Sequence, residues 1–511
     1  MRYLFIIIIT LSIGCTKDQN ILNNNTANNF ISFSVDTLLF DTVFTTTGSS
    51  TRYLKVYNNL NEDINIDYIS LAQGESSSFK LNIDGEANHS IANTLLRTGD
   101  SLYIFAEVTI DPNGLNSPLI ETDSIIFNYN NKIQDVDLVA WGRDAYFHSS
   151  LPDFQQHQAS NLDSMLYSNF FSNVPLELIN EQFYYYSVNE FTEWTNDKPH
   201  VIYGDVIVEN GATLKIQQGC ELYLHNNAWI VIDSLSSLHS VGTLSMPITI
   251  QSDRTDSHSI IDYSNTPGQW GKIWMLPGSN NHIIEYTIIK NGKTGIHIDG
   301  VNDINSLPSS PILTIKNSII FNMSDIGLLA QGSKIYGENM LIANCGTSLI
   351  GLNIGGHYEF KHCTFANFWP FNSRQTPSVF LNNYYEDNNG IIQERDLIRA
   401  DFGNSIITGA NENEIFFDQS SNENTIFNYN LDYCFLKLDT NYWNNWNQEV
   451  FEGNILNGEI GFADYEIFNF ELDSNSIAID AGSELISKDV PTDINGVNRT
   501  INPDLGCFEM N

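Results

Sequence analysis

Three acidic side chains and one arginine near the carboxyl end of the chain could form ion pairs, hold a metal ion or act as acid and base. They are Asp480, Asp493, Arg499 and Asp504. The stretch from Asp493 to Gly496 reads Asp-x-Asn-Gly, half of an oxygen-ligand loop of the kind that binds calcium. Carboxylates beside an arginine more often form a buried ion-pair network than a catalytic centre. We predict such a network, with calcium binding and catalysis as alternatives.

Basic side chains that could act on an anionic substrate are scarce, because Lys and Arg total 23 of 511 residues. Arg395 and Arg399 lie together, with Glu394 and Asp396 beside them. A polysaccharide lyase needs a base near a neutralised uronate, and this is the best such position in the chain. A solvated loop explains the same residues equally well. The sequence contains no recognisable Ser-His-Asp set, metal cluster or phosphate loop, so we predict no catalytic residue, metal site or cofactor.

Aromatic rings offer a second kind of chemistry, because planar sugar rings dock on exposed aromatic side chains beside a few polar groups. Five aromatic residues lie in loops outside the regular strand pattern, and we predict that they bind carbohydrate: Trp369, Tyr384, Tyr385, Trp443 and Trp446. The alternative for each of them is partial burial under its own loop.

Six short segments between residues 284 and 436 must position these loops. Each reads apolar, any, polar, small, any, apolar, and they begin at Ile284, Ile315, Gly337, Phe360, Phe402 and Leu431. Alternation at both ends is typical of strands, and recurrence is typical of one unit stacked on itself. The segments start 31, 22, 23, 42 and 29 residues apart. Spacings of 22 and 23 residues predict one turn of a parallel β-solenoid. Spacings of 29 and 31 predict one turn with an added loop, and the spacing of 42 predicts two turns.

The repeat also predicts the core and the bends. The fourth position should form one interior file: Thr287, Ser318, Met340, Cys363, Ser405 and Cys434. The last position should form another: Ile289, Ile320, Ile342, Phe365, Ile407 and Leu436. The third position holds Asn317, Asn339 and Asn404, and asparagine tolerates left-handed backbone at a bend. His362 takes that position in one copy, so we interpret it as structural rather than as a catalytic base.

The first fifteen residues read as an export signal. Residues 4–13 are almost purely apolar, too short to span the ~30 Å hydrocarbon core but typical of a signal peptide. The small residues before Cys15 resemble the lipobox of bacterial lipoproteins, which implies a diacylglyceryl group on Cys15. We predict a signal peptide over 1–14, a tether over 15–29 and a cell-envelope, outer-membrane location, with an ordinary signal peptide as the alternative. Lys17 and Asp18 resemble the signal that sends Bacteroidetes-type lipoproteins to the outer face.

Composition fits an exported all-β protein, with 42 % hydrophobic, 12 % aromatic and only 16 % charged residues. The formal charge of −38 excludes nucleic acid as a partner, because nucleic-acid binding needs basic patches. It also argues against free polyanionic sugars, unless divalent cations bridge the two. Five further cysteines cannot all pair and lack Cys-x-x-Cys spacing, so we interpret them as core residues.

Three folded blocks follow the tether. Residues 30–145 contain regular short strands with turn residues between them, and phrases such as Leu54 to Asn58 resemble immunoglobulin-like β-sandwich modules of bacterial surface lipoproteins. Residues 146–196 are predicted to connect this block to the solenoid and to pack on it, with a helix over 162–171. The Gly-centred bends and alternation from residue 197 resemble the right-handed parallel β-helix of pectin-lyase-like proteins, which we predict over 197–470.

The last block, 471–511, should close the solenoid end. Ser476 to Gly482, Asp493 to Arg499 and Pro503 to Glu509 resemble the SPAIDAG, DxxGxxR and PDIGAFE phrases that end many bacterial β-helix surface proteins. Departures at Ile477, Leu505 and Cys507 stay apolar or small. The sequence therefore favours a lipid-anchored envelope protein whose β-helix is a non-catalytic binding or structural surface, for glycan or another surface component. A polysaccharide lyase or glycoside hydrolase without a familiar motif is the alternative.

Overall fold

The structure is a computed structural model that describes residues 30–45, 48–110, 119–149, 157–158, 184–256, 262–300, 307–387, 389–439 and 453–510. The predicted signal peptide, the tether, Cys15, Trp443, Trp446 and the expected helix over 162–171 lie outside these ranges. The chain divides into two compact units, the first built mainly from residues 47–110 and 120–141 and the second from residue 142 onward.

The first unit is a β-sandwich, as predicted. One sheet has the order β1 (Ser32–Phe33), β3 (Arg52–Tyr57), β8 (Ser101–Val108), β5 (Phe79–Ile83) and β6 (Glu86–Ala87). The other has the order β2 (Thr37–Phe44), β10 (Lys132–Arg143), β9 (Leu119–Tyr129), β4 (Ile64–Leu71) and β7 (Ser90–Leu96). Aromatic rings join the two inner faces, since Phe33 lies 4.8 Å from Phe127 and Phe40 lies 5.5 Å from Phe79 between ring centroids. A 3₁₀ turn at Gly74–Ser76 follows β4.

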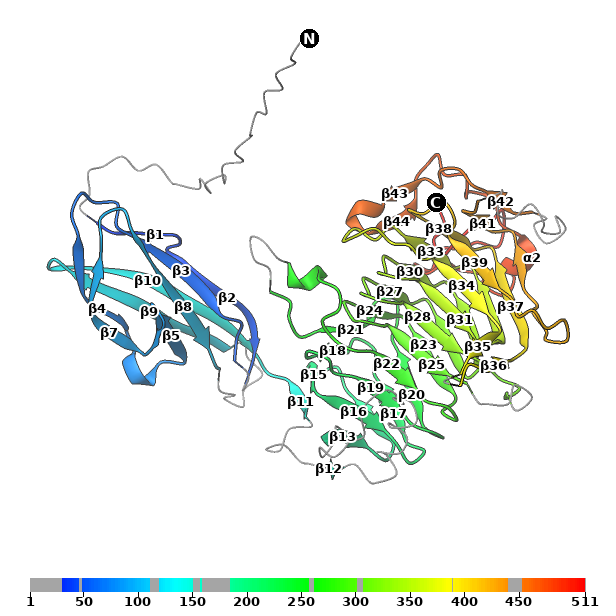
Figure 1. The fold of residues 1–511 in the computed structure, drawn as a ribbon, viewed down its shortest axis with the longest axis horizontal. Coiled ribbons are helices and arrows are strands. Elements are labelled where there is room, and N and C mark those ends of the chain that lie inside the picture. Colours follow the sequence, from blue (N-terminus) through cyan, green and yellow to red (C-terminus); the bar gives the residue numbers. More distant parts are fainter. Residues whose placement is uncertain are drawn as a thin grey trace, which may run out of the picture. The chain divides into compact units, whose positions relative to one another are not determined.

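The second unit is a parallel β-helix, in which successive strands join three long sheets in turn (Figure 1). The eleven-stranded sheet contains β11 (Tyr146–Ser149), β15 (His200–Tyr203), β18 (Glu221–Leu224), β21 (Ile248–Ser252), β24 (Thr287–Lys290), β27 (Ile319–Phe321), β30 (Leu341–Ala343), β33 (Thr364–Asn367), β38 (Ile406–Gly409), β41 (Phe435–Leu436) and β42 (Ile455–Leu456). The ten-stranded sheet contains β12 (His157–Gln158), β13 (Tyr184–Val188), β16 (Asp205–Val208), β19 (Ile230–Ile232), β22 (Ile273–Met275), β25 (Ile296–Asp299), β28 (Leu328–Gln331), β31 (Ile350–Asn353), β34 (Val379–Asn382) and β39 (Ile415–Asp418). The nine-stranded sheet contains β14 (Thr192–Trp194), β17 (Thr213–Ile216), β20 (Ser237–Val241), β23 (His282–Glu285), β26 (Leu313–Lys316), β29 (Lys334–Glu338), β32 (Gly356–Lys361), β37 (Leu397–Gly403) and β40 (Asn430–Asp432).

The six-segment repeat is what winds this helix. Its last-position residues pair in register along the eleven-stranded sheet, and all six are fully buried. Its fourth-position residues are buried beside them, and hydrogen bonds link Thr287 to Ser318 and Cys363 to Ser405 across neighbouring coils. Each buried aliphatic side chain of such a file stabilises the fold by about 1.5–3 kcal/mol. The predicted solenoid and its interior files are confirmed, while the right-handed winding remains a prediction.

Left-handed backbone marks each bend of the repeat. All six third-position residues have φ between 44° and 51°: Tyr286, Asn317, Asn339, His362, Asn404 and Tyr433. Asn339 Nδ2 donates to Asn317 Oδ1 at 2.9 Å, so an amide also bonds coil to coil. The five cysteines of the described helix and its C-terminal segment are free and buried, as the core interpretation required: Cys220, Cys345, Cys363, Cys434 and Cys507.

Two sequence expectations about the coils need correction. Phe365 pairs directly with Ile407, so the spacing of 42 is one coil and not two. The extra residues form a loop over 368–378 and the antiparallel hairpin of β35 (Tyr384–Glu386) and β36 (Ile392–Glu394). The helix also begins earlier than residue 197, because β11, β13 and β14 already pair in parallel with β15, β16 and β17. Their short, tyrosine-rich strands lack the clean alternation that would have revealed them.

The C-terminal segment covers a flank of the helix. After β42 it forms β43 (Phe462–Asp464), a 3₁₀ turn (Tyr465–Ile467), β44 (Asn469–Leu472) and α2 (Glu484–Ser487). Apolar side chains from this segment, such as Phe470 and Leu505, pack on outward-facing residues of the eleven-stranded sheet, including Ile406 and Phe435. The segment therefore packs along the side of the helix, as far back as Ile319 and Phe321 of β27, rather than over its end as the sequence had suggested.

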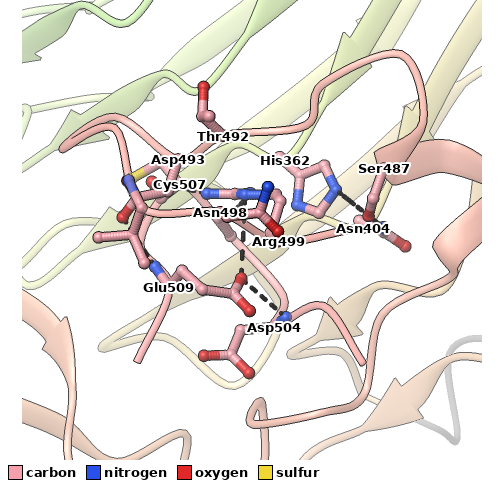
Figure 2. Close-up of polar contacts among 12 residues, drawn as sticks. His362, Asn404, Ser487, Thr492, Asp493, Asn498, Arg499, Asp504, Cys507 and Glu509 are labelled. Carbon is pink, nitrogen blue, oxygen red and sulfur yellow. Dashed lines mark hydrogen bonds and ion pairs between the residues drawn. The ribbon is translucent and has the colours of Figure 1, made fainter. Parts of the chain in front are cut away.

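Arg499 lies at the centre of this segment, fully buried (Figure 2). Its guanidinium donates to the carbonyl oxygens of Gly506 (2.9 Å) and Cys507 (3.2 Å), and its Nε lies 3.8 Å from a Glu509 oxygen. Asp493 instead accepts backbone N–H groups from Asn495, Val497 and Glu509. The charged network was predicted, but Arg499 bonds mainly to carbonyls and its acidic neighbour is Glu509.

His362 is held in the same region, where its Nε2 lies 2.8 Å from the hydroxyl oxygen of Ser487 and 2.9 Å from the amide nitrogen of Asn404 (Figure 2). Asn404 also donates to the carbonyl of Ser483. The ring is fully buried, and burial holds the pKa of His362 well below its usual range. The structural interpretation of this histidine fits these contacts.

Glu509 makes the stability of this segment depend on pH. Burial, with Asp504 and Asp493 nearby, raises the pKa of its carboxyl from 4.5 to about 7. The folded state then binds this proton more tightly than the unfolded chain, so the contribution is fullest below pH 4.5 and is lost as pH rises through about 7. We expect Glu509→Gln to flatten the dependence of Tm on pH across this window. Thermal unfolding in a pH series measures it, with exposed Glu471→Gln as control, and an unchanged slope would contradict the assignment.

Candidate active site

Every coil of the ten-stranded sheet places, on the outer face, a side chain that lies between two inward ones. In register along the helix these residues are Ile207, Val231, Trp274, His297, Leu329, Gly351, Phe380 and Phe416. The rings of Phe380 and Phe416 are nearly parallel, with centroids 5.8 Å apart. We call this mainly apolar file the outer strip.

Lys272 lies beside the outer strip, immediately before β22. Its Nζ is 3.9 Å from the ring centroid of Trp274 and 4.8 Å from that of Trp229. Burial lowers the pKa of this amine to about 8, although Asp299 and Asp325 oppose the shift. Removal from water disfavours the charged form of a lysine, so a substantial fraction of Lys272 is neutral slightly above neutral pH.

A hydrogen-bonded chain orients Lys272. Its Nζ lies 2.8 Å from His297 Nδ1, and a lysine nitrogen in this contact is the donor. His297 Nε2 lies 3.0 Å from Asp299 Oδ1 and 3.2 Å from the side-chain nitrogen of Gln331. The second oxygen of Asp299 accepts from Trp274 Nε1 at 2.7 Å. The neutral amine can donate one N–H to His297 and keep its lone pair for an incoming proton.

Asp205 lies two coils before Lys272, at the equivalent position of its own coil. Asp205, Trp229 and Lys272 each immediately precede aligned residues of β16, β19 and β22. Coils stack at ~4.8 Å, which places the outer two Cα atoms roughly 10 Å apart. Burial raises the pKa of Asp205 to about 6, and one oxygen accepts the backbone N–H of Trp229 at 3.1 Å. Trp229 therefore contacts both titratable groups.

The arrangement can supply a proton and remove one. The carboxyl of Asp205 is shifted toward its protonated form and the amine of Lys272 toward its neutral form. Environments that push two pKa values in these directions are how proteins prepare an acid and a base at neutral pH. An acid and a base that act on one glycosidic bond lie about 5–10 Å apart, and the Cα atoms of Asp205 and Lys272 are separated by roughly 10 Å.

The sequence-predicted aromatic residues flank β34 of the same sheet. Trp369 is half-buried in the loop before β34, with its ring 4.8 Å from that of Phe371. Tyr384 and Tyr385 follow β34, and the hydroxyl of Tyr384 donates to the carboxylate of Asp418 at 2.9 Å. Trp369 and the tyrosines thus lie at opposite ends of the strand and form no common platform.

The basic cluster near residue 395 is taken up by ion pairs on the nine-stranded sheet. Arg399 bonds Glu359 at 3.1 Å and also Asp401. Glu394 accepts hydrogen bonds from Asn422 and Thr425. The solvated-loop interpretation is wrong for two of these residues, because Glu394 lies on β36 and Arg399 on β37. The ion pairs leave Arg399 little freedom to act as a base.

Sequence reasoning missed Asp205, Lys272 and His297. The signal was present as Lys-x-Trp at 272–274 followed by His-x-Asp at 297–299. It becomes meaningful only when the register that stacks Trp274 on His297 is known.

The described ranges contain no group of three or more His, Cys, Asp or Glu residues placed to hold a metal ion. Within those same ranges no helix has the length and apolar character needed to cross a membrane.

No family model and no curated protein matches the chain. Solved structures it resembles include PapD-like domain 7 of human CEP192, with 9 % identity, a TM-score of 0.16 and coverage of 25 % of this chain and 96 % of that one. A family 123 glycoside hydrolase from Clostridium perfringens has 9 % identity, a TM-score of 0.16 and 28 % coverage of both chains. The catalytic unit of a GH87 alpha-1,3-glucanase from Streptomyces thermodiastaticus has 10 % identity, a TM-score of 0.16 and coverage of 75 % and 79 %. Similarity at this level says nothing about activity. The evidence for the β-helix is the pairing of its own strands.

Proposed function

We propose that this protein is a lipid-anchored cell-envelope enzyme that holds a uronate-containing polysaccharide on the outer strip and cleaves it by β-elimination. The observation that carries the proposal is the alignment of Asp205 and Lys272 at the same position of two coils, one on each side of the coil of Trp229. Burial there lowers the pKa of the amine to about 8 and raises that of the carboxyl to about 6. Anchoring at Cys15 and the outer-membrane location are supported by the sequence alone.

The chemistry assigns one role to each group. Neutral Lys272 takes the proton from the carbon next to the uronate carboxyl group, and the glycosidic C–O bond on the adjacent carbon breaks. Protonated Asp205 gives its proton to the leaving oxygen, and a carbon–carbon double bond remains in the product. The ammonium formed on Lys272 lies beside the negative charge that develops on the substrate. His297 and Asp299 hold the amine in place.

A non-catalytic glycan-binding surface is the second candidate, and the parallel rings of Phe380 and Phe416 favour it. The test incubates the purified protein with uronate polymers and follows ultraviolet absorbance of unsaturated product, reducing ends and binding. Absorbing product supports elimination. New reducing ends without absorbing product would show that the polymer is hydrolysed instead. Binding without turnover would favour the second candidate, a non-catalytic binding surface. If the protein neither bound nor cleaved these polymers, both candidate functions would be overturned.

The pH dependence of cleavage follows from the two shifts. The active form needs Lys272 neutral and Asp205 protonated, although the base has the higher pKa. Below about pH 6 further protonation of Lys272 lowers kcat/KM tenfold per unit, and above about pH 8 further ionisation of Asp205 does the same. We expect a bell-shaped profile centred near pH 7. A rate that keeps rising above pH 8 would show that Asp205 is not the acid.

A further inference from the structure

An aromatic cluster is exposed on the sandwich unit, on the outer face of the sheet that contains β3 and β8. Tyr53 lies opposite Phe105, and Lys55 lies opposite Tyr103, in the antiparallel pairing of these strands. The three aromatic residues are 50 %, 39 % and 41 % exposed, in the order Tyr53, Phe105, Tyr103. Side chains of this size are normally covered, and an exposed group of them marks a contact surface.

The rings form one connected group. Centroids of Tyr53 and Tyr103 are 5.9 Å apart, and Phe105 lies 6.2 Å from each of them. The planes of Tyr103 and Phe105 differ by only 15°. Tyr53 is tilted by 43° to Tyr103 and by 54° to Phe105. Tyr103 and Phe105, which share an orientation, offer a surface on which the apolar face of a sugar can stack.

The charge around the cluster narrows the choice of partner. Lys55 Nζ lies 4.7 Å above the Tyr103 ring, and Lys80 is exposed on neighbouring β5, where it pairs in register with Glu107. The opposite outer face carries exposed Asp135 and Asp137 on β10 instead. In a chain of net charge −38, this face therefore combines aromatic rings with two lysines and two carboxylates, Glu107 and Asp84, the second of which follows β5 opposite Tyr103. Charges farther away than about 8 Å are largely screened at physiological salt. The nearby lysines therefore have more influence than the net charge of the chain on which ligand this face binds.

We propose that this face, defined by Tyr53, Lys55, Lys80, Tyr103 and Phe105, binds an anionic polysaccharide segment. A sugar face stacks on the near-parallel rings of Tyr103 and Phe105, Tyr53 contacts the sugar from the side, and carboxylate groups pair with the two ammonium groups. The site goes beyond the proposed function, because it is separate from Lys272 and needs no cleavage. It would hold a long polymer, while a short oligosaccharide that fills only the outer strip would not need it.

The test measures binding of the full chain carrying Lys272→Met, which removes turnover, to polygalacturonate. We expect Tyr103→Ala with Phe105→Ala to weaken binding of the long polymer by about tenfold or more. Lys55→Met should reduce the dependence of Kd on salt. Tyr68→Ala, which removes a 58 % exposed tyrosine from the other sheet, is the matched control and should leave Kd unchanged. In the active chain the same cluster variants should leave kcat/KM for a trisaccharide unchanged, so this site and the cleavage proposal can fail separately.

Three results would overturn the assignment. Unchanged polymer binding in folded cluster variants would remove the site. Equal affinity for a carboxyl-reduced, neutral polymer would remove the role of the lysines. Concentration-dependent dimerisation in sedimentation that Tyr53→Ala abolishes would show that a second copy of the chain occupies this face instead.

Discussion

Lys272→Met should lower kcat/KM for uronate polymers by about 10²–10⁴-fold, the range that a positioned general base contributes. Methionine keeps an unbranched apolar stem against Trp229 and Trp274 and removes only the amine. The loss should therefore appear in turnover, while Tm and polymer binding stay near those of the unchanged protein. Initial rates from the absorbance of unsaturated product measure it.

The variant Lys272→Arg tests whether Lys272 acts as a base or only binds the substrate through its positive charge. Arginine keeps a cation that can donate to His297, but it does not lose its proton in proteins. We expect this variant to be as inactive as Lys272→Met. Lys293→Met is the matched control, because Lys293 is an exposed lysine on the adjacent coil whose Nζ bonds Asn227. If Lys272→Arg kept a tenth or more of the rate, the lysine would serve to bind substrate and another group would be the base.

The fold was readable from the sequence because its determinants are local and repeated. An interior file shows itself as one apolar position that returns in every segment, and Ile289, Ile320 and Ile342 pair in that register. The bends were readable for the same reason, since Asn317, Asn339 and Asn404 mark left-handed backbone. Sequence spacing could not distinguish an extra coil from an insertion, so the interval of 42 residues was misinterpreted.

The candidate active site was not readable, because its members come from different coils. Asp205 and Lys272 are 67 positions apart in the sequence and come together only through parallel stacking of β16, β19 and β22. Their pKa shifts arise from burial among side chains of several coils, which no single segment reveals. The C-terminal network was predicted only in part. Acidic residues and an arginine predicted charges in contact, but the backbone groups that satisfy Asp493 and Arg499 carry no sequence signal.

The loop before β34 depends on a buried ion pair, and breaking it should produce the largest stability loss in the helix. Arg374, in that loop, bonds Glu414, immediately before β39, and the Glu414 side chain is 0 % exposed. Glu414 also accepts the N–H (2.9 Å) and hydroxyl (2.7 Å) of Ser378. Removing one member of a buried pair leaves an uncompensated charge and costs about 3–5 kcal/mol. We expect Glu414→Ala to lower the free energy of unfolding of the helix by this amount.

A double-mutant cycle tests whether the cost is the stranded charge or the lost packing. Arg374→Met alone should be strongly destabilising, whereas Arg374→Met combined with Glu414→Leu should cost less than the sum of the single variants, because neither charge then remains unpaired. The backbone N–H groups of Ser378 and Asn411 would still lose their acceptor, which keeps the double variant about 1–3 kcal/mol below the original protein. Urea unfolding followed by tryptophan fluorescence measures all four forms. The half-exposed pair of Arg399 and Asp401 is the control, and its cycle should give at most about 1 kcal/mol. Simple additivity at Arg374 and Glu414 would mean that the two side chains stabilise the loop independently, through packing rather than through their charges.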